Sequence, residues 1–446
     1  MKIVIATTNE GKFKEIKAFL EREINEEIEI LSLSDFSEVP EVKESAKTIR
    51  GNALLKGKVY SRFLSLPVIV EDSALEVDAL NGAPGVYSSR YGRDDQERIS
   101  KLLKALEGVP FEDRTARFRC VMVLALPTGE RFVSQGKVEG TITTFPRGSS
   151  GFGYDPIFFY TPLGKTFAEL SREEKLAVSH RGKALRGILK FVKFLHLGEI
   201  LRGFNKVAVA LSGGIDSSFL AFSAKRFCDE VYALFADTPF LTEEARIRVR
   251  KHAELLGVKL VSLKLNLLSL SELSNNSALR CYYCKKAMYE LFLDWAKDKN
   301  LIVLDGTNFS DLSEDRPGLK ALEELKVVSP LKLAKLTKEE IRELSKYFKL
   351  PFWNQPPGTC LATRFYRGLA IDSKILRKVE EAEAYLKLLG FKVVRVRVDQ
   401  PDICRVEFGK DEIKRALNPD LYVDLVKEFK RIGFNRVSVD LEGYKA

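Results

Sequence analysis

Cysteine, histidine, methionine and tryptophan are scarce in this chain of 446 residues, which holds 6, 3, 3 and 2 of them, respectively. Six cysteines over such a length are too few and too unevenly placed for a disulfide framework, and they suit a reducing compartment. Cysteines that do stand close together in the sequence therefore need another explanation. A metal site or catalysis is the expected one.

Long hydrophobic runs are also missing. No run of about eighteen uncharged apolar residues occurs. The first residues, MKIVIATTNEGK, pass from a short apolar run directly into a polar loop, without the pattern of a signal peptide. We therefore expect a soluble, cytoplasmic protein with no membrane partner.

An excess of acidic charge is absent too, since 72 Lys and Arg stand against 62 Asp and Glu, a formal net charge of +10. A basic chain favours polyanionic ligands such as nucleoside triphosphates or RNA. Acids and bases alternate along the expected helices, as in KFKEIKAFLEREINEE. This pattern is typical of an ion-paired, solvated surface, so we expect small nucleotides as partners rather than nucleic acid.

Short apolar runs such as KIVIAT, LPVIVED, FRCVMVLAL, KVAVALSGG and LIVLDGT alternate with amphipathic segments. This alternation predicts an α/β fold, and the length predicts more than one domain. We expect a mixed α/β domain over residues 1–197, a parallel-sheet domain over 204–368 and a small α/β appendage over 369–446. Each apolar run ends in polar residues, at the place where α/β sheets usually bind ligands.

The first polar cluster follows the strand KIVIA and precedes an expected helix. Backbone N–H groups at such a turn bind phosphate, and Lys12 adds a positive charge. Alone, this loop indicates little, because a capping turn with an exposed lysine is the commoner explanation. Its residues are Thr7, Thr8, Asn9, Glu10, Gly11 and Lys12.

Further polar clusters strengthen this prediction. Paired carboxylates can hold Mg²⁺, and lysines with an arginine can balance a triphosphate. Taken singly, Glu71 could be an acid at a sheet edge and His180 a core histidine. The clusters comprise Glu71, Asp72 and Ser73, then GFGYDP at 151–156, and then Lys175, His180 and Arg181.

Over about residues 1–195 the chain resembles the inosine/xanthosine triphosphate pyrophosphatase family, through TTNEGK, EDSALEVDALNGAPGVYSSRYG, GFGYDPIF and REEKLAVSHRGKAL. The resemblance implies Mg²⁺-dependent hydrolysis of ITP, dITP and XTP to the monophosphate and pyrophosphate, by a homo-oligomer. It implies that Asp72 binds metal and acts as the base, that Glu44 is a second metal ligand and that Lys12 is catalytic. The residues implied to bind substrate are Thr7, Thr8, Asn9, Glu10, Gly11, Lys12, Ser73, Phe152, Gly153, Tyr154, Asp155, Lys175, His180 and Arg181.

A second loop, SGGIDSS, follows the strand KVAVAL. Its glycines let the backbone wrap a phosphate, and it lacks the lysine of a Walker loop, which argues against γ-phosphoryl transfer. The loop resembles that of the PP-loop ATP pyrophosphatases, whose fold is adenine nucleotide α-hydrolase-like and which adenylate a substrate. The implied ATP-binding residues are Ser212, Gly213, Gly214, Asp216, Ser217 and Ser218.

Three cysteines stand in polar motifs, namely Cys281 and Cys284 in RCYYCKK and Cys360 in WNQPPGTCLATRF. Three thiolates suit an iron–sulfur cluster or a catalytic zinc with one open position, whereas a structural zinc takes four ligands. The alternative is a buried helical pair and an isolated loop thiol. The other cysteines, Cys120, Cys228 and Cys404, lie in apolar surroundings and are expected in the core.

Residues 204–446 resemble the LarE sulfur transferases, through SGGIDSS, YYCKKAMYE, VLDGTN, DRPGLKAL, WNQPPGTCLATRF, AEAYLKLLGFKVVRVRV and SVDLEGYKA. The resemblance implies that ATP adenylates a carboxylate of a nicotinate-derived mononucleotide, which then receives sulfur for a nickel-pincer cofactor. It also implies a 4Fe-4S cluster on the three cysteines, or loss of sulfur from Cys360 itself. Arg395 and Arg397, on one face of a strand, are candidates for the substrate phosphate. Glu383 and Glu407 match acids that the family places near a metal, and both could equally be surface acids.

Two alternatives stay open for this half. Enzymes that thiolate tRNA also combine an SGGxDS loop with CxxC and a further cysteine, and a basic chain suits RNA. A nucleotide-sensing module without catalysis is the other alternative.

Overall fold

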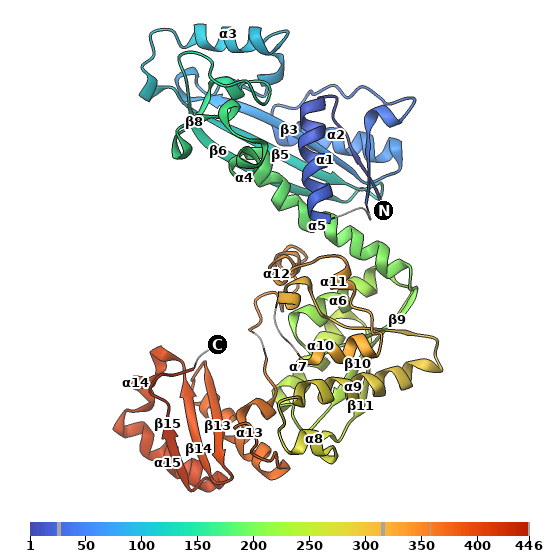
Figure 1. The fold of residues 1–446 in the computed structure, drawn as a ribbon, viewed down its shortest axis with the longest axis vertical. Helices are drawn as coiled ribbons and strands as arrows, with labels where there is room; N and C mark the ends of the chain where they lie inside the picture. The colour runs from blue at the N-terminus through green and yellow to red at the C-terminus, as the bar shows by residue number, and fades with distance from the viewer. Residues whose placement is uncertain (25–27, 314–316, 357, 445–446) are drawn as a thin grey trace. The chain divides into compact units, whose positions relative to one another are not determined.

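The computed structural model describes residues 1–24, 28–313, 317–356 and 358–444, which divide into two compact units, 1–196 and 197–446 (Figure 1). The division falls within helix α5 (His180–Arg202). Asp315, Arg316, Pro357, Lys445 and Ala446, which belong to three of the motifs quoted above, lie outside the described residues. None of the described helices combines the length and the apolar character needed to cross a bilayer.

Unit 1 (residues 1–196) is built on a mixed sheet of eight described strands, in the order β2-β1-β3-β5-β6-β7-β8 with β4 paired to β3. Strand β1 is parallel to β2 and β3, and the other pairs are antiparallel. The mixed α/β prediction is confirmed. The strands are β1 (Lys2–Ile5), β2 (Glu29–Ser32), β3 (Val68–Val77), β4 (Pro84–Gly85), β5 (Thr115–Ala125), β6 (Arg131–Ile142), β7 (Phe158–Tyr160) and β8 (Lys165–Thr166).

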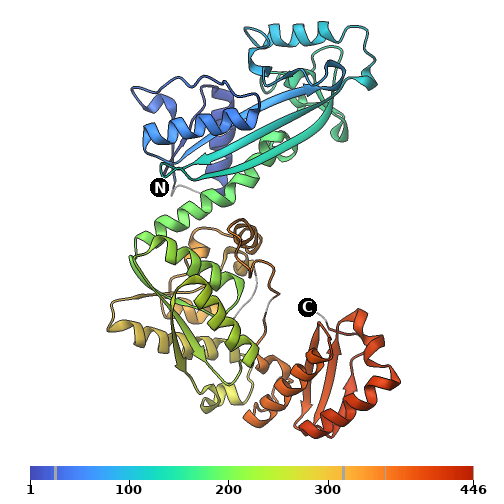
Figure 2. The same cartoon turned by 180° about the vertical axis from the view of Figure 1, so that it is seen from behind.

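Helices cover both faces of this sheet. Val68 and Val70 of β3 pack with α2, whereas Gly136 of β6 lies against the first turn of α5 on the opposite face, on which α1 also lies (Figures 1 and 2). Side-chain caps begin three of the helices, at Thr48, Asp94 and Ser171. Besides α5, the helices are α1 (Glu10–Ile24), α2 (Ile49–Leu64), α3 (Asp95–Ala105) and α4 (Arg172–Val178).

Unit 2 (residues 197–446) contains a sheet of four described strands in the order β11-β10-β9-β12, all parallel. The expectation of a further parallel sheet is therefore confirmed. The strands are β9 (Lys206–Ala210), β10 (Glu230–Asp237), β11 (Lys259–Lys264) and β12 (Ile302–Leu304). The helices along this part are α6 (Ile215–Phe227), α7 (Glu243–Leu256), α8 (Ser271–Ser274), α9 (Arg280–Lys297), α10 (Pro317–Glu324), α11 (Pro330–Leu333) and α12 (Lys338–Tyr347).

The last part of unit 2 forms a sheet of its own, in which β14 pairs antiparallel with β13 and parallel with β15. Its apolar core includes Phe408 and Phe429 and extends to Phe240 and Leu361, so it continues into the segment that follows Cys360. The elements are α13 (Ser373–Leu388), β13 (Val394–Gln400), β14 (Ile403–Phe408), α14 (Ile413–Ala416), α15 (Pro419–Ile432) and β15 (Arg436–Val439).

Candidate active sites

The loop between β1 and α1 is held by its own side chains. Asn9 N donates to Thr7 Oγ1 at 3.2 Å, and Asn9 Oδ1 accepts from Lys12 N at 2.9 Å. A Cβ atom on Gly11 would lie 2.8 Å from the ring of Phe152, so only glycine lets this ring approach the loop so closely. Glu10 does not join the site, because it points outward and pairs with Lys14 at 2.7 Å.

Glu71 and Asp72 point to opposite faces of the sheet, as neighbours in a strand must. Glu71 faces α1 and α5, and it is nearly completely buried. Lys12 Nζ lies 2.6 Å from its Oε1, and Arg181 Nε donates to its Oε2 at 3.0 Å. Burial alone would raise the pKa of Glu71, but Arg181 and Lys12 outweigh burial and hold it well below its usual range. Glu71 is therefore an anion that anchors two cations.

Asp72 faces α2, where Lys56 Nζ lies 3.5 Å from its Oδ1 and 2.9 Å from Glu44 Oε1. Burial raises the pKa of Asp72 above its usual value, although Lys56 opposes the shift. Its Oδ2 is buried and has no hydrogen-bond partner among the described residues. The sequence reasoning missed Lys56, which looks like any other lysine of an amphipathic helix.

The two carboxylates of Glu44 and Asp72 fit a magnesium ion. Mg²⁺ prefers oxygen ligands and usually keeps several waters besides one or two carboxylates. No group of three or more His, Cys, Asp or Glu side chains in the described part of the chain converges on a metal position, so two protein carboxylates are what this site offers. The unpartnered Oδ2 of Asp72 is the oxygen that such an ion would satisfy.

A chain of buried ion pairs connects Glu71 to the GFGYDP loop. Arg181 Nη1 donates to Glu15 Oε2 at 2.6 Å, and Lys175 Nζ contacts Glu15 Oε1 at 2.9 Å and Asp155 Oδ2 at 2.7 Å. Burial would raise the pKa of Glu15, but Arg181 and Lys175 more than offset it and lower the pKa. Glu15 was not selected from the sequence. It joins two predicted residues, Lys175 and Arg181, that come from two different helices.

The aromatic ring of the GFGYDP loop lies over these cations. Lys175 Nζ is 4.8 Å, and the guanidinium of Arg181 5.2 Å, from the centre of the Phe152 ring. Asp155 Oδ2 accepts from Phe152 N at 2.9 Å, which folds the loop back on itself. The ring thus lies over Lys175 and Arg181, and its backbone is held by Asp155, the partner of Lys175.

His180 is buried and neutral. Its ring stacks on Phe118, with ring centres 4.6 Å apart. Burial, reinforced by Arg181, lowers the pKa of His180 well below its usual value. Nδ1 of this ring has no partner among the described residues, so it offers a free hydrogen-bonding atom.

Several of these groups surround one cleft. Nine predicted residues line it, whereas Thr7, Thr8, Glu10, Gly11, Glu44, Glu71, Asp72 and Lys175 do not. The nine are Asn9, Lys12, Ser73, Phe152, Gly153, Tyr154, Asp155, His180 and Arg181. Asp95 and Arg98 line it as well, and sequence reasoning missed both because they lie in an ordinary charged helix start.

The comparisons with known proteins concern this unit. A model of the Ham1 family matches residues 3–191. The dITP/XTP pyrophosphatase of Geobacter sulfurreducens is 49% identical over 187 residues, which cover 41% of this chain and 92% of that protein. The chain belongs to the Ham1 family.

Other Ham1 relatives align in the same way. The dITP/XTP pyrophosphatase of Geobacillus kaustophilus is 48% identical over 186 residues, covering 41% of this chain and 90% of that protein. The solved structure of a HAM1 protein from Coxiella burnetii is 42% identical and covers 42% of this chain and 95% of that one, with a TM-score of 0.38. Unit 1 is accordingly called the Ham1 unit below.

Unit 2, which follows the Ham1 unit, carries the second predicted loop at the carboxyl end of β9. Ser217 Oγ accepts from Ser212 N at 3.2 Å and donates to Gly214 O at 3.2 Å. Gly213 has a φ of +73°, a conformation that favours glycine. Gln355, five residues before Cys360, donates to Gly213 O at 2.7 Å. The loop therefore has a defined shape, and α6 begins within it, at Ile215.

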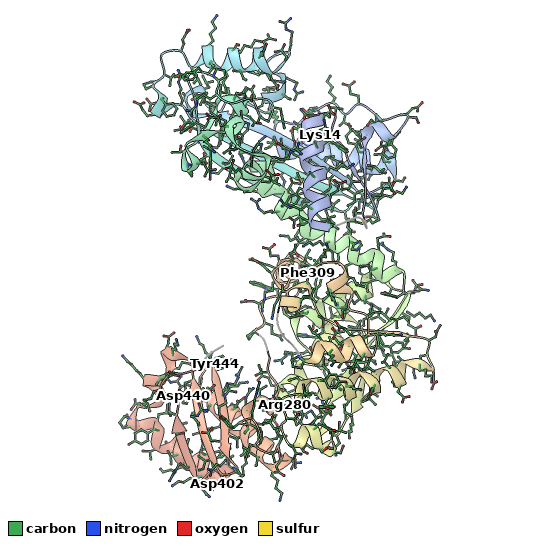
Figure 3. The ribbon with its side chains drawn as sticks, in the orientation of Figure 1. Lys14, Arg280, Phe309, Asp402, Asp440 and Tyr444 are labelled. Atoms are coloured by element: carbon green, nitrogen blue, oxygen red, sulfur yellow. The ribbon has the colours of Figure 1, made fainter. Side chains whose placement is uncertain are left out.

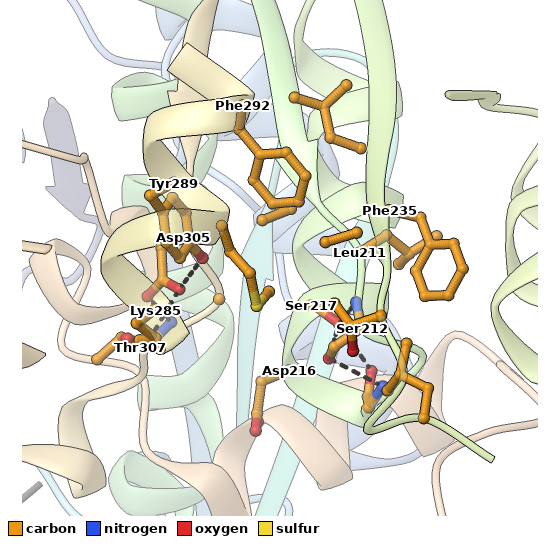
Figure 4. A pocket seen from close by; sticks show the side chains of 18 of the residues that line it. Leu211, Ser212, Asp216, Ser217, Phe235, Lys285, Tyr289, Phe292, Asp305 and Thr307 are labelled. Carbon is orange, nitrogen blue, oxygen red and sulfur yellow. Dashed lines mark hydrogen bonds and ion pairs between the residues drawn. The ribbon is translucent and has the colours of Figure 1, made fainter. Parts of the chain in front are cut away.

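A cavity of about 280 Å³ opens beside this loop (Figure 4). Ser212, Gly214, Asp216 and Ser217 line one side, and apolar side chains that include Phe292 form part of the wall. Ser218 does not line the cavity, because its Oγ lies 2.7 Å from Nδ1 of the buried His252.

Across the cavity stands a group of polar residues that sequence reasoning did not select individually. Tyr289 Oη donates to Asp305 Oδ2, Thr307 N donates to Asp305 Oδ1 at 2.7 Å, and Lys285 Nζ lies 3.6 Å from Asp305 Oδ2 (Figure 4). Burial would raise the pKa of Asp305, but Lys285 and these hydrogen bonds lower it. Lys285 supplies the positive charge that the loop itself lacks. In the sequence, only its place in the RCYYCKK motif distinguished Lys285 from other lysines.

The three motif cysteines lie close enough for their charges to interact, but in the described part of the chain they do not form a group that could hold a single metal ion. Cys281 and Cys284 lie in the first turn of α9, which begins at Arg280 (Figure 3), and Cys360 precedes the short helix 361–364. Burial, with the charges of Cys360 and Cys281 adding to it, raises the pKa of Cys284 to about 12. Burial also raises the pKa of Cys360, and Arg280 opposes that shift. Of the other three cysteines, Cys120 and Cys404 are buried and Cys228 is half-buried.

The predicted phosphate site on β13 is occupied by protein groups. Arg397 binds both carboxylate oxygens of Glu407, at 2.9 and 2.8 Å, and donates to Thr363 O at 2.8 Å. Arg395 donates to Val394 O and lies over the ring of Tyr444, 4.9 Å from its centre. Arg397 therefore has few N–H groups left to donate to a phosphate, whereas Arg395 has more. Glu383 is engaged as well, in a buried pair with Arg364 at 2.7 Å.

Proposed function

We propose that the Ham1 unit hydrolyses ITP, dITP and XTP to the monophosphate and pyrophosphate. Two of its relatives that are 48–49% identical are dITP/XTP pyrophosphatases. The observation that carries the proposal is the cleft itself, in which Lys12 and Arg181 adjoin an aromatic ring and a neutral histidine. A triphosphate needs the cations, and a purine base suits the ring.

Asp72 is the proposed general base. Its raised pKa brings it closer to neutral pH than an ordinary aspartate, which makes it a better proton acceptor for water while it stays ionised. Glu44 and Asp72 would hold Mg²⁺, which supplies charge neutralisation at phosphate oxygens when bound. Lys56 lies between the two carboxylates and keeps them close to each other.

The purine base of the substrate is selected by buried polar groups that need hydrogen-bond partners. Nδ1 of His180 is buried without a protein partner, and the pKa of this histidine is lowered, so the ring is neutral at pH 7. A site that hydrogen-bonds a 6-oxo purine leaves buried groups unpaired when the 6-amino group of adenine arrives, and such a mismatch is rejected strongly. We therefore expect ITP and XTP to be hydrolysed far faster than ATP.

The experiment is to incubate the full chain with Mg²⁺ and either ITP, dITP, XTP, GTP or ATP, and to identify the products. Monophosphate with pyrophosphate from the first three nucleotides supports the proposal. Release of orthophosphate, or equal rates for all five nucleotides, contradicts it.

For unit 2 we propose ATP-dependent adenylation followed by sulfur transfer to a carboxylate of a nicotinate-derived mononucleotide. The supporting observation is the cavity between the Ser212–Ser218 loop and Lys285, with Cys284 adjoining Lys285 in the same helix turn. The substrate carboxylate would attack the α-phosphorus of ATP and release pyrophosphate. A sulfur nucleophile would then attack the acyl carbon and displace AMP.

The sulfur donor is proposed to be a 4Fe-4S cluster on Cys281, Cys284 and Cys360. A cluster takes each thiolate on a different iron, so its ligands do not need to converge on a single ion, and among the described residues they do not. Raised thiol pKa values mean that metal binding must displace protons from Cys284 and Cys360. When bound, the cluster would supply a sulfide; the protein residues position the acyl adenylate.

The Asp72→Asn variant provides the test, because it removes pyrophosphate release by the Ham1 unit. This variant would be given ATP and a nicotinate-derived mononucleotide, and AMP, pyrophosphate and thioacid product would be measured. Product formation supports the proposal. AMP release only with tRNA would favour the tRNA-thiolating alternative, and ATP binding without cleavage would favour the sensing module.

A further inference from the structure

Two residues outside the predicted set, Asp95 and Arg98, lie in the first turn of α3 and line the cleft of the Ham1 unit beside Phe152. They do not cap the helix. That is done by Asp94, whose Oδ1 accepts from Glu97 N at 2.8 Å. The two cleft residues are thus free for another role.

Asp95 holds the middle of the GFGYDP loop. Its Oδ2 accepts from Gly153 N at 2.7 Å, and its Oδ1 pairs with Arg98. Gly153 has a φ of +65°, and the residue before it carries the ring that lies over Lys175 and Arg181. The carboxylate of Asp95 therefore binds the backbone amide that directly follows Phe152.

Arg98 extends this connection to a second loop. Its Nη1 donates to Ser89 O at 2.6 Å, and Tyr154 Oη donates to Ser88 O at 2.9 Å. Ser88 Oγ in turn accepts from Leu75 N at 2.8 Å, which joins the loop to β3. Hydrogen bonds thus connect α3, the loop of Ser88 and Ser89, and the GFGYDP loop around the part of the cleft that faces Phe152.

We propose that Asp95 is a positioning residue that sets the purine selectivity of the cleft. It fixes the Gly153 amide, and with it the ring of Phe152 over Lys175 and Arg181, where a 6-oxo purine would lie. The inference rests on the proposed nucleotide hydrolysis, and it explains how the cleft selects the purine base. Asp95 contacts neither Glu44 nor Asp72, so it acts on substrate fit rather than on the chemical step.

The test compares kcat and KM of the full chain for ITP and ATP, without an acceptor carboxylate for unit 2, with those of the Asp95→Ala variant. Losing a hydrogen bond to a charged acceptor is expected to raise KM for ITP about fivefold or more, with kcat within about threefold. The ratio of kcat/KM for ITP over ATP should fall as well. Asp95→Asn keeps an acceptor for Gly153 N and should restore most of this ratio, and it replaces the alanine variant if that one does not fold.

Asp94→Ala is the matched control, since it removes the cap of the same helix one residue away. An equal loss of selectivity in this control would show that only the stability of α3 matters, and would overturn the proposal. So would an Asp95→Ala variant that loses kcat but keeps KM and the ITP/ATP ratio. A wild-type chain that hydrolyses neither ITP nor XTP would instead overturn the proposed function.

Discussion

Lys12 Nζ lies 2.6 Å from Glu71 Oε1, and only 1% of the Glu71 side chain is exposed to solvent. This carboxylate also receives two hydrogen bonds from Arg181. Removing one partner from such a buried group leaves a charge without compensation, which typically costs about 3–5 kcal/mol. Lys12, the proposed phosphate-binding lysine of the Ham1 unit, is thus held by a carboxylate that is itself part of the core.

Glu71→Gln should lower the thermal unfolding temperature of the Ham1 unit and slow ITP hydrolysis, because the buried Arg181 and the half-buried Lys12 would lose the anion that they share. Calorimetry of the full chain would follow the unfolding of the Ham1 unit. Glu76→Gln is the control, since Glu76 lies on the same strand and pairs with the exposed Arg119 at 3.3 Å. Equal effects of the two substitutions would contradict the prediction.

The stability of the Ham1 unit should depend on pH through the same carboxylate. Because its folded-state pKa is lowered, Glu71 contributes stability that is fully present above its unfolded pKa of about 4.3 and is lost as the pH falls through the folded pKa. Unfolding temperatures measured from neutral pH to about pH 3 should therefore fall more steeply for the wild type than for Glu71→Gln. Parallel curves would show that Glu71 is not the group that titrates.

Asp72→Asn should abolish ITP hydrolysis while leaving the fold intact, because an amide neither accepts the proton of water nor ligates Mg²⁺ well. Initial rates of ITP hydrolysis with Mg²⁺ would test this prediction. Asp78→Asn, at a surface pair with Arg117, is the control, and an active Asp72→Asn chain would sink the assignment of the base.

Motifs separated in the sequence meet in one cleft because the loop after β1, the middle of β3 and the start of α5 come together there; β3 continues to Val77, past the polar residues that were expected to end it. Asn9 follows β1, Ser73 lies in β3, and His180 begins α5, and all three line the cleft. Periodicity and the polar ends of apolar runs were enough to select them. The parallel sheet of unit 2 was predictable for the same reason, since strands and helices alternate there.

Charged residues whose partners lie in another helix or strand could not be predicted from the sequence. Glu15 joins Lys175 across 160 residues of sequence, and nothing around it distinguishes it from the other acids of α1. Arg397 illustrates the opposite case, in which a selected residue already has a protein partner, Glu407. Such pairings depend on which side chains the tertiary fold brings together, and sequence spacing alone carries no information about them.

Ser217→Ala should weaken ATP binding to unit 2 by about tenfold, because Ser217 Oγ shapes the loop through its contacts with Ser212 and Gly214. Calorimetric titration with ATP would measure the change in an Asp72→Asn background, in which the Ham1 unit does not turn over nucleotide. Ser223→Ala is the control, since this serine of the same helix only bonds to Phe219 O, at 2.8 Å. If both variants bind ATP like the parent chain, the loop does not form the nucleotide site.

Cys281→Ser should remove iron and labile sulfide from protein purified without oxygen, together with broad absorption near about 400 nm, because the cluster would lose one of its three ligands. ITP hydrolysis should be unchanged, since the Ham1 unit holds none of these cysteines. Cys228→Ser is the matched control, because this thiol only contacts Leu201 O at 3.3 Å and should leave the iron content as in the wild type. Colour that survives in Cys281→Ser would exclude the three-cysteine cluster. A wild-type chain that binds zinc or no metal would leave Cys360 as the sulfur donor itself, or favour the tRNA-thiolating alternative.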